Sequence, residues 1–322
     1  MMRRRDVLMA AGALAAPAVV QAQDFPARPL RLVVPFAAGG GTDVLARILA
    51  NAMSEKLGQP VVVENRTGAA GNLAMENVIR APADGYAMLM GTNGAVAVNR
   101  HLYRDLAFDP LRDLAPVSLT FRIEHLLAVS NALPAKSVAE LIALAKAQPG
   151  SLTFGSGGVG SMIHLAGELF RVKTGIDMVH VPYRGGGPAM NDLVAGTISM
   201  MFDSLPSAEP QVTAGRVRAL ALCAAKRHKL MPDLPTMQEA GVPGYAAGTF
   251  AGLFVPRNTP QPVIARLGGV VRDLVATPAF VEQLGRSGGD AAASSPAELG
   301  EMMAQDSAQW EVVVREAKLS AT

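Results

Sequence analysis

Short apolar runs alternate with amphipathic stretches along the first third of the chain. Residues 30–36, 61–64 and 87–91 are runs of this kind, and they predict buried strands. Apolar residues recur at helical spacing after residue 42 and again over residues 72–80. Strands that alternate with helices predict βαβ units and a parallel sheet, in which ligands bind at the carboxyl ends of the strands.

The pattern starts afresh near residue 122. The later apolar runs predict strands at 125–130, 152–154, 178–182, 198–202, 217–221 and 250–255. Helices are expected at 138–147, after residue 161, and at 189–195, 263–276, 278–286 and 297–318. The last three helices have no strands between them, so we expect them to pack on the first sheet.

This arrangement predicts an α/β fold with two lobes, each a mostly parallel sheet flanked by helices. Lobe 1 is expected to hold residues 23–122 and 249–322, and lobe 2 residues 123–248. Two crossing strands would form the hinge between the lobes.

Glycine-rich loops follow several of the predicted strands. Gly39, Gly40 and Gly41 precede Thr42 and Asp43, which suit the N-cap and first turn of a helix. A similar triple glycine at residues 185–187 follows Val-Pro-Tyr, as the first follows Val-Pro-Phe. A glycine loop that opens a helix offers unpaired N–H donors and the positive end of a dipole, so it favours anions. We expect these loops to converge on one small acidic ligand.

Residues 1–22 have the features of an export signal. Three arginines precede an apolar stretch, and cleavage is expected near Ala22. The run from Arg4 to Met9 favours the twin-arginine route, and an ordinary Sec signal is the alternative. No cysteine follows the cleavage site, so no lipid anchor is indicated, and the mature chain is predicted to be periplasmic.

Composition argues against a nucleic-acid surface. The whole chain carries 29 Lys and Arg against 27 Asp and Glu. Cleavage removes three Arg and one Asp, which leaves the mature chain with no net charge. Cys223 is the single cysteine, so no intrachain disulfide forms, and its apolar surroundings predict a buried structural thiol. No mature segment has the length and apolarity of a membrane span.

One loop matches a dinucleotide-binding fingerprint. Residues 155–160 read Gly-Ser-Gly-Gly-Val-Gly between a predicted strand and a predicted helix. The acidic residue that would bind the ribose should close the next strand, whereas Asp177 precedes it. An exported nucleotide- or flavin-dependent enzyme that uses this loop is therefore the alternative function, and a bound cofactor is not expected.

No catalytic or metal-binding group is predicted. The five histidines are scattered, and there is no G-x-S-x-G elbow. His164 either donates to a ligand or is hydrogen-bonded within its lobe. Asp43 and Asp203 follow strands, and each would recognise a ligand amino group or hold loop N–H groups; Asp43 also suits a helix-dipole acid. Phe36 and Tyr183 are expected to wall the site.

Together these segments resemble the TctC/Bug family, the extracytoplasmic receptors of tripartite tricarboxylate transporters. The resemblance lies in VPFAAGGGTDVLAR, GTNGAVAVN, LTFGSGGVGSMIHLAGELF, VPYRGGGPAMNDLVAG and RALALCAAKRHKLMPDLPTMQEAGVPGY, and it covers essentially the whole mature chain. It implies a two-lobed periplasmic-binding-protein fold of type II. The protein would be a receptor, not an enzyme, that closes on a di- or tricarboxylate, an acidic amino acid or an aromatic acid. Membrane permease subunits would be its partners, and a ligand sensor for a signalling protein is a further alternative. The chain is expected to be a monomer.

The resemblance and the loop analysis together give the predicted ligand-binding residues. They are Phe36, Ala37, Gly39, Gly40, Thr42, Asp43, Asn93, Ser156, Gly157, Gly160, Ser161, His164, Tyr183, Gly185, Gly186 and Asp203. The chain departs from the family's pattern at residues 247–250, where relatives often carry bulkier aromatics, and at residues 122–125, which are more charged than expected for a hinge crossing. Both departures leave the identity of the ligand open.

Overall fold

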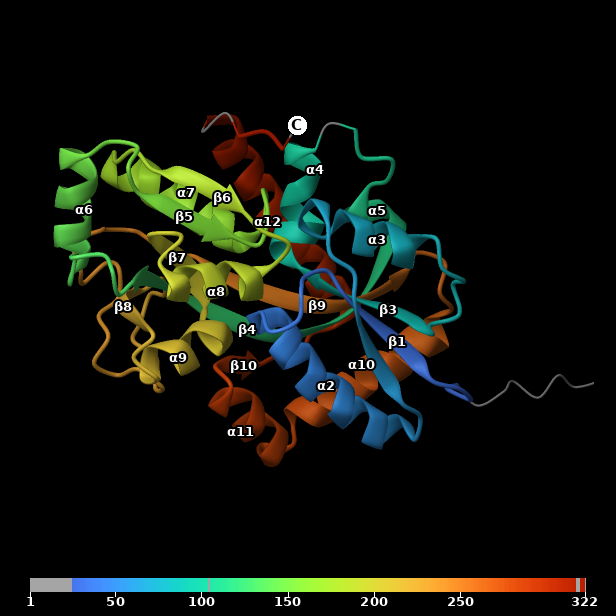
Figure 1. Ribbon diagram of the computed structural model, residues 1–322. Coiled ribbons are helices and arrows are strands. Elements are labelled where there is room, and N and C mark those ends of the chain that lie inside the picture. The colour runs from blue at the N-terminus through green and yellow to red at the C-terminus, as the bar shows by residue number, and fades with distance from the viewer. Residues whose placement is uncertain (1–24, 104, 317–318, 322) are drawn as a thin grey trace, which may run out of the picture.

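The computed structural model describes residues 25–103, 105–316 and 319–321, and it has an α/β fold (Figure 1). The predicted export signal, residues 1–22, lies outside the described residues. Within the described part of the chain, no helix combines the length and the apolarity needed to cross a bilayer.

The first half of the sheet begins with three parallel strands. β1 (Leu30–Val34) lies between β2 (Val61–Asn65) and β3 (Ala87–Thr92). β9 (Gly248–Pro256) pairs antiparallel with β3, and β4 (Leu114–Ser130) pairs antiparallel with β9. The short strand β10 (Gly289–Ala291) closes this half by pairing antiparallel with β4.

The second half is built on the other end of β4. β7 (Met200–Ser204) and β8 (Val217–Leu222) each pair antiparallel with β4. β5 (Thr153–Ser156) continues parallel to β7, and β6 (Val179–Pro182) lies parallel to β5 at the edge. The partners of β4 change between Glu124, which faces Gly248 on β9, and His125, which faces Ser204 on β7. The long strand β4 therefore belongs to both halves of the molecule (Figure 1).

The α/β architecture agrees with the prediction, but both halves contain mixed sheets. The predicted parallel pairs are present, and the strands that cross between the halves, β4 and β9, pair antiparallel with their neighbours. Residues 114–124 of β4 were not predicted as strand. They contain Pro116, and because most of them are buried they show no alternation of apolar and polar residues. The lobe boundaries near residues 122 and 249 stay a prediction.

Helices cover both faces of each half. In chain order they are α2 (Gly41–Leu57), α3 (Asn72–Ile79), α6 (Val138–Ala147), α7 (Met162–Thr174), α8 (Gly186–Ala195), α9 (Leu205–Thr213), α10 (Gln261–Val275), α11 (Pro278–Arg286) and α12 (Pro296–Glu316). Short turns of helix lie at η1 (Ala69–Gly71), η2 (Gly94–Val98), α4 (Asn99–Leu102) and α5 (Pro110–Asp113). Of the longer helices, α9 was not predicted, because prolines at 206 and 210 hide its helical character.

The three C-terminal helices pack on the first half of the sheet, as predicted. α10 and α11 contribute Leu267 and Leu284 to the core on the face that α2 also covers. α12 contributes Leu299 and Met303 to the core on the opposite face, beside α3. Met162 at the start of α7 joins this same core, so the two halves of the molecule are in direct contact.

Candidate functional site

A small cavity lies between the two halves. No acidic side chain and no Lys or Arg occurs among the residues that line it. Its volume of about 30 Å³ is enough for about two water molecules. The lining residues are Phe36, Gly40, Gly41, Thr42, Thr92, His125, Gly157, Ser161, Met162, Ile163, Gly186, Ser204 and Thr249. Both halves contribute, so the shape of the cavity depends on how closely they approach each other.

Four helices point their N-termini at this cavity. The first or capping residues of α2, α7, α8 and α9 are among its lining residues. Ser161 caps α7, because its Oγ accepts a hydrogen bond from His164 N at 3.3 Å. No described side chain caps α2, α8 or α9. The first-turn N–H groups of these helices are therefore available to an anion, and the helix dipoles add positive potential.

The two triple-glycine loops touch each other across the cleft. Ala37 N donates to Arg184 O at 3.2 Å, which joins the two halves through backbone alone. A Cβ on Gly187 would lie 2.7 Å from Ala38 O, and a Cβ on Gly185 would lie 2.7 Å from Ala37 N. Side chains at these two positions would hold the halves apart, so the glycines also permit this close approach, a role that the sequence did not indicate.

Asp43 holds the first glycine loop in shape. It is only 3% exposed, and its carboxylate accepts hydrogen bonds from Gly39 N at 3.0 Å, Asn65 Nδ2 at 2.8 Å and Arg47 Nε at 3.0 Å. Burial acts to raise its pKa, but these hydrogen bonds outweigh it, so the pKa lies below its ordinary value. Of the three roles considered for Asp43, the geometry shows it holding a loop N–H group from the first turn of α2.

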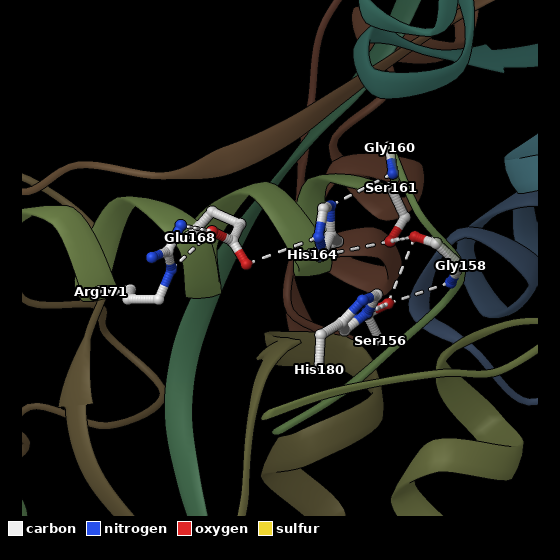
Figure 2. Close-up of polar contacts among 8 residues, drawn as sticks. All are labelled: Ser156, Gly158, Gly160, Ser161, His164, Glu168, Arg171 and His180. Atoms are coloured by element: carbon white, nitrogen blue, oxygen red, sulfur yellow. Dashed lines mark hydrogen bonds and ion pairs between the residues drawn. The ribbon is translucent and has the colours of Figure 1, made fainter. Parts of the chain in front are cut away.

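Two histidines, the buried His164 and the half-buried His180, hold the serine–glycine loop (Figure 2). His180 Nε2 lies 2.6 Å from Ser156 Oγ, which in turn accepts a hydrogen bond from Gly158 N at 3.1 Å. His164 Nδ1 accepts a hydrogen bond from Gly160 N at 3.3 Å, and its ring centroid lies 4.1 Å from that of His180. Burial lowers the pKa of His164 to about 3 and that of His180 to about 4, so both rings are neutral at pH 7.

His164 is thus hydrogen-bonded within its own half, the second of the two roles considered for it. Its other nitrogen, Nε2, lies 3.7 Å from Glu168 Oε1, and Glu168 is paired with Arg171 at 2.8 Å (Figure 2). The ring is 4% exposed and is not among the lining residues of the cavity. It supports the loop that carries Gly157 and Ser161, which do line the cavity.

Asp203 lies immediately behind the cavity wall. It is completely buried, and a Cβ on Gly186 would lie 3.1 Å from its Oδ1. Ser204 Oγ donates to Oδ1 at 3.3 Å, whereas Oδ2 has no partner among the described residues. Burial raises the pKa of Asp203 to about 6, and hydrogen bonds from Ser207 and Ser204 limit the rise.

Tyr183 and Asn93 point their polar groups at other protein groups. Tyr183 Oη donates to Asp192 Oδ2 at 2.6 Å, and burial together with this carboxylate raises the pKa of the phenol to about 12. Asn93 Oδ1 accepts from Phe250 N at 3.3 Å. Tyr183 does line a second hollow on the other side of the glycine loops, together with Gly157 and Arg184.

The predicted site residues therefore divide into two groups. Those that line the cavity are Phe36, Gly40, Thr42, Gly157, Ser161 and Gly186. Those that support or adjoin it are Ala37, Gly39, Asp43, Asn93, Ser156, Gly160, His164, Tyr183, Gly185 and Asp203. Their predicted role in ligand binding stays a prediction.

Several polar lining residues were not predicted. Thr92, His125, Ser204 and Thr249 come from β3, β4, β7 and β9, and they form a surface that we call the polar floor. Thr92 and Ser204 are the last residues of their strands, next to the predicted residues Asn93 and Asp203, and this position could have identified them from the sequence. His125 and Thr249 lie within the crossing strands, where sequence position alone gave no indication. No group of three or more potential metal ligands occurs among the described residues.

Comparison with known proteins gives a consistent set of relatives. The family model described as "Tripartite tricarboxylate transporter family receptor", TctC, matches residues 45–319. Protein BugT from Bordetella pertussis is 35% identical over 311 residues, which is 96% of this chain and 95% of BugT.

Two solved structures of relatives were obtained with ligands. R. palustris Rpa4515 with adipate has a TM-score of 0.90 and 39% identity, covering 92% of this chain and 99% of that one. MatC from Rhodopseudomonas palustris with bound malate has a TM-score of 0.85 and 33% identity, covering 90% of this chain and 100% of that one.

Proposed function

The chain belongs to the TctC family of tripartite tricarboxylate transporter receptors, and we propose that it captures a small carboxylate between its two halves. The observation that carries this proposal is the set of four helix N-termini around one cavity that no Lys or Arg lines. Such a site offers N–H donors to a carboxylate without requiring a cationic side chain.

The expected strength of binding is adequate for a transport receptor. A hydrogen bond to a charged group contributes roughly 1.5–3 kcal/mol. Several of them supply the ~8 kcal/mol of a micromolar complex after the costs of association are met. Asp43 and His164 hold the two glycine loops in shape, so the free first-turn N–H groups beside these loops need little reorganisation to bind, which lowers those costs.

Relatives with adipate and with malate support a carboxylic acid as the ligand class. Di- and tricarboxylates, acidic amino acids and aromatic acids all belong to the range proposed for this chain. A cavity with room for about two water molecules is smaller than any of these acids. Ligand entry therefore requires the halves to separate, which breaks the backbone contact between Ala37 and Arg184.

The cellular setting follows from the same proposal. Cleavage of the export signal near Ala22 would release a monomeric receptor into the periplasm. The closed form would present both halves together to the membrane permease subunits of a tripartite transporter, because closure changes the surface that they jointly offer. A signalling partner in place of the permease would use the same ligand-dependent closure.

The alternative of a nucleotide-dependent enzyme receives less support from the geometry. In the loop at residues 155–160, Gly158 N is bonded to Ser156 Oγ and Gly160 N to His164 Nδ1. These N–H groups are occupied within the loop and are not available to a pyrophosphate.

Calorimetry on mature, ligand-stripped protein tests the proposal. Titration with malate, succinate, adipate, citrate, glutamate and benzoate should give saturable binding of at least one acid. Failure of every carboxylic acid tried to bind correctly folded protein would refute the receptor function.

Gly187→Ala tests closure itself. The new Cβ would meet Ala38 O at 2.7 Å, so the halves cannot close fully and the affinity for the bound acid should fall roughly ten-fold or more. The fold should be unharmed, because alanine is favoured over glycine in the helix α8 by about 0.5–1 kcal/mol.

Gly269→Ala is the matched control for Gly187→Ala. Gly269 lies within α10, where the nearest atom to a new Cβ is at the end of the Arg272 side chain, 3.8 Å away. This variant should gain stability and keep its affinity. Equal affinities of both variants would contradict the role of the glycine contact in closure.

A further inference from the structure

One residue of the polar floor, His125, has no role in the carboxylate binding proposed above. His125 is completely buried in β4 and lines the cavity. Its Nε2 lies 2.8 Å from Thr249 Oγ1, whereas its Nδ1 has no partner among the described residues. A buried nitrogen without a partner costs free energy, which a ligand group at this position would recover.

His125 meets the ligand as a neutral ring. Burial lowers its pKa to about 4, so at pH 7 one ring nitrogen is a donor and the other an acceptor. If Thr249 Oγ1 donates to Nε2, then Nδ1 carries the proton and is a donor; if Oγ1 accepts from Nε2, then Nδ1 is an acceptor. A hydroxyl group satisfies Nδ1 in both tautomers, since it donates as well as accepts.

The surroundings of His125 disfavour a second negative charge. The other groups of the polar floor are the hydroxyls of Thr92, Ser204 and Thr249, which are neutral. The acid that lies directly behind the wall is Asp203, and it is bonded to Ser204, which faces His125 in the pairing of β4 with β7. No Lys or Arg lines the cavity to offset a carboxylate placed here.

We propose that His125 is a specificity-determining residue that binds a hydroxyl group of the ligand, so that the receptor prefers hydroxycarboxylic acids. In this arrangement the N-termini of α2, α7 and α8 hold the carboxylate while His125 and the polar floor, at the N-terminus of α9, hold the hydroxyl. The proposal rests on the proposed function, because it assigns a ligand class to the same cavity. An acid of the same length without the hydroxyl leaves Nδ1 unsatisfied and binds more weakly.

Matched pairs of acids test this assignment. The affinities of ligand-stripped protein are measured by calorimetry for malate against succinate and for lactate against propionate. The hydroxy acid of at least one pair should bind roughly ten-fold tighter or more, since a site built to bond a hydroxyl penalises its absence. In His125→Phe the ratio within that pair should fall to near one while the unsubstituted acid still binds.

His101→Phe is the matched control, because His101 lies in α4, bonds Ser307 at 2.8 Å and does not line the cavity. It should retain the wild-type ratio. If the wild type binds both members of each pair equally well, the receptor function stands and the assignment of His125 is wrong. If no acid binds at all, the receptor function itself fails.

Nitrogen NMR of histidine-labelled wild-type protein gives a readout that does not depend on a variant folding. The Nδ1 resonance of His125 should shift when malate is added and shift much less with succinate. Equal shifts with both acids would overturn the assignment.

Discussion

The loop before α2 and the loop before α7 present glycine backbone to the same cavity but are stabilised by opposite means. The first depends on an ionised carboxylate, Asp43, which bonds Gly39 N and pairs with the half-exposed Arg47. The second depends on neutral groups: Ser156 and His164 accept hydrogen bonds from glycine N–H groups, and His180 bonds Ser156. Similar glycine motifs can therefore conceal quite different responses to pH and salt.

The largest effect is expected from removing the carboxylate of the first loop. Asp43→Ala leaves Gly39 N, the Asn65 amide and Arg47 without their acceptor, and should lower the free energy of unfolding by about 2–3 kcal/mol. Urea denaturation measures the change. Asp43→Asn keeps the shape and one acceptor oxygen, so it should lose about half as much; an equal loss would mean that charge alone matters.

An intermediate effect is expected from pH. The pKa of His180 is 6.5 in the unfolded chain and about 4 in the folded protein, so between these pH values the unfolded chain binds a proton there and the folded protein does not. The free energy of unfolding therefore falls as the pH is lowered from 6.5 to about 4. His180→Phe removes this contribution and should reduce the slope of stability against pH by about 1 kcal/mol per pH unit. Denaturation at a series of pH values between 7 and 5 measures the slope.

Two neighbouring groups titrate both in the wild type and in His180→Phe, so their contributions to the slope are present in both proteins. His164, 4.1 Å from His180, changes stability in the same direction, and Asp203, with its pKa raised to about 6, changes it in the opposite direction. Asp43→Asn should leave the slope above pH 5 unchanged, because a carboxylate of lowered pKa loses its contribution only below its ordinary value of 3.8. A slope that responds to Asp43→Asn and not to His180→Phe would reverse the comparison of the loops.

The smallest effect is expected from the exposed partner of the first loop. Arg47 is 49% exposed, and exposed ion pairs contribute about 0–1 kcal/mol. Arg47→Gln should therefore cost about 0.5 kcal/mol at low salt and less in high salt, as measured by urea denaturation at two ionic strengths. A loss as large as that of Asp43→Ala would show that the arginine, not the backbone contact, holds the loop.

The local pattern predicted most of the fold. Apolar runs located β1, β2 and β3, and capping residues located α6 and α7, because these signals lie within a few neighbouring residues. The N-terminal part of β4 escaped, since a strand buried on both faces shows no alternation. The helix α9 was missed because Pro206 and Pro210 argue against a helix, although Pro206 stands in the first turn, where no intrahelical hydrogen bond is lost.

The candidate site was predicted where glycine loops form it and missed where distant strands form it. Gly40 and Gly186 follow directly from the loop motifs. His125 and Thr249 are in contact only because β4 and β9 pair side by side, which brings together residues that are 124 positions apart. The supporting role of Asp43 depends on Asn65, which lies at the end of β2, 22 positions further along the chain.

The change of partners along β4 has a consequence for the order of events in binding. His125 lies at the position where this strand passes from one sheet to the other, beside the axis about which the halves would swing. Atoms near a pivot travel little, so in the proposed closure the glycine loops would move further than His125. An arriving molecule would then meet an almost finished floor before it is enclosed, and its chemical identity would be checked before it is trapped.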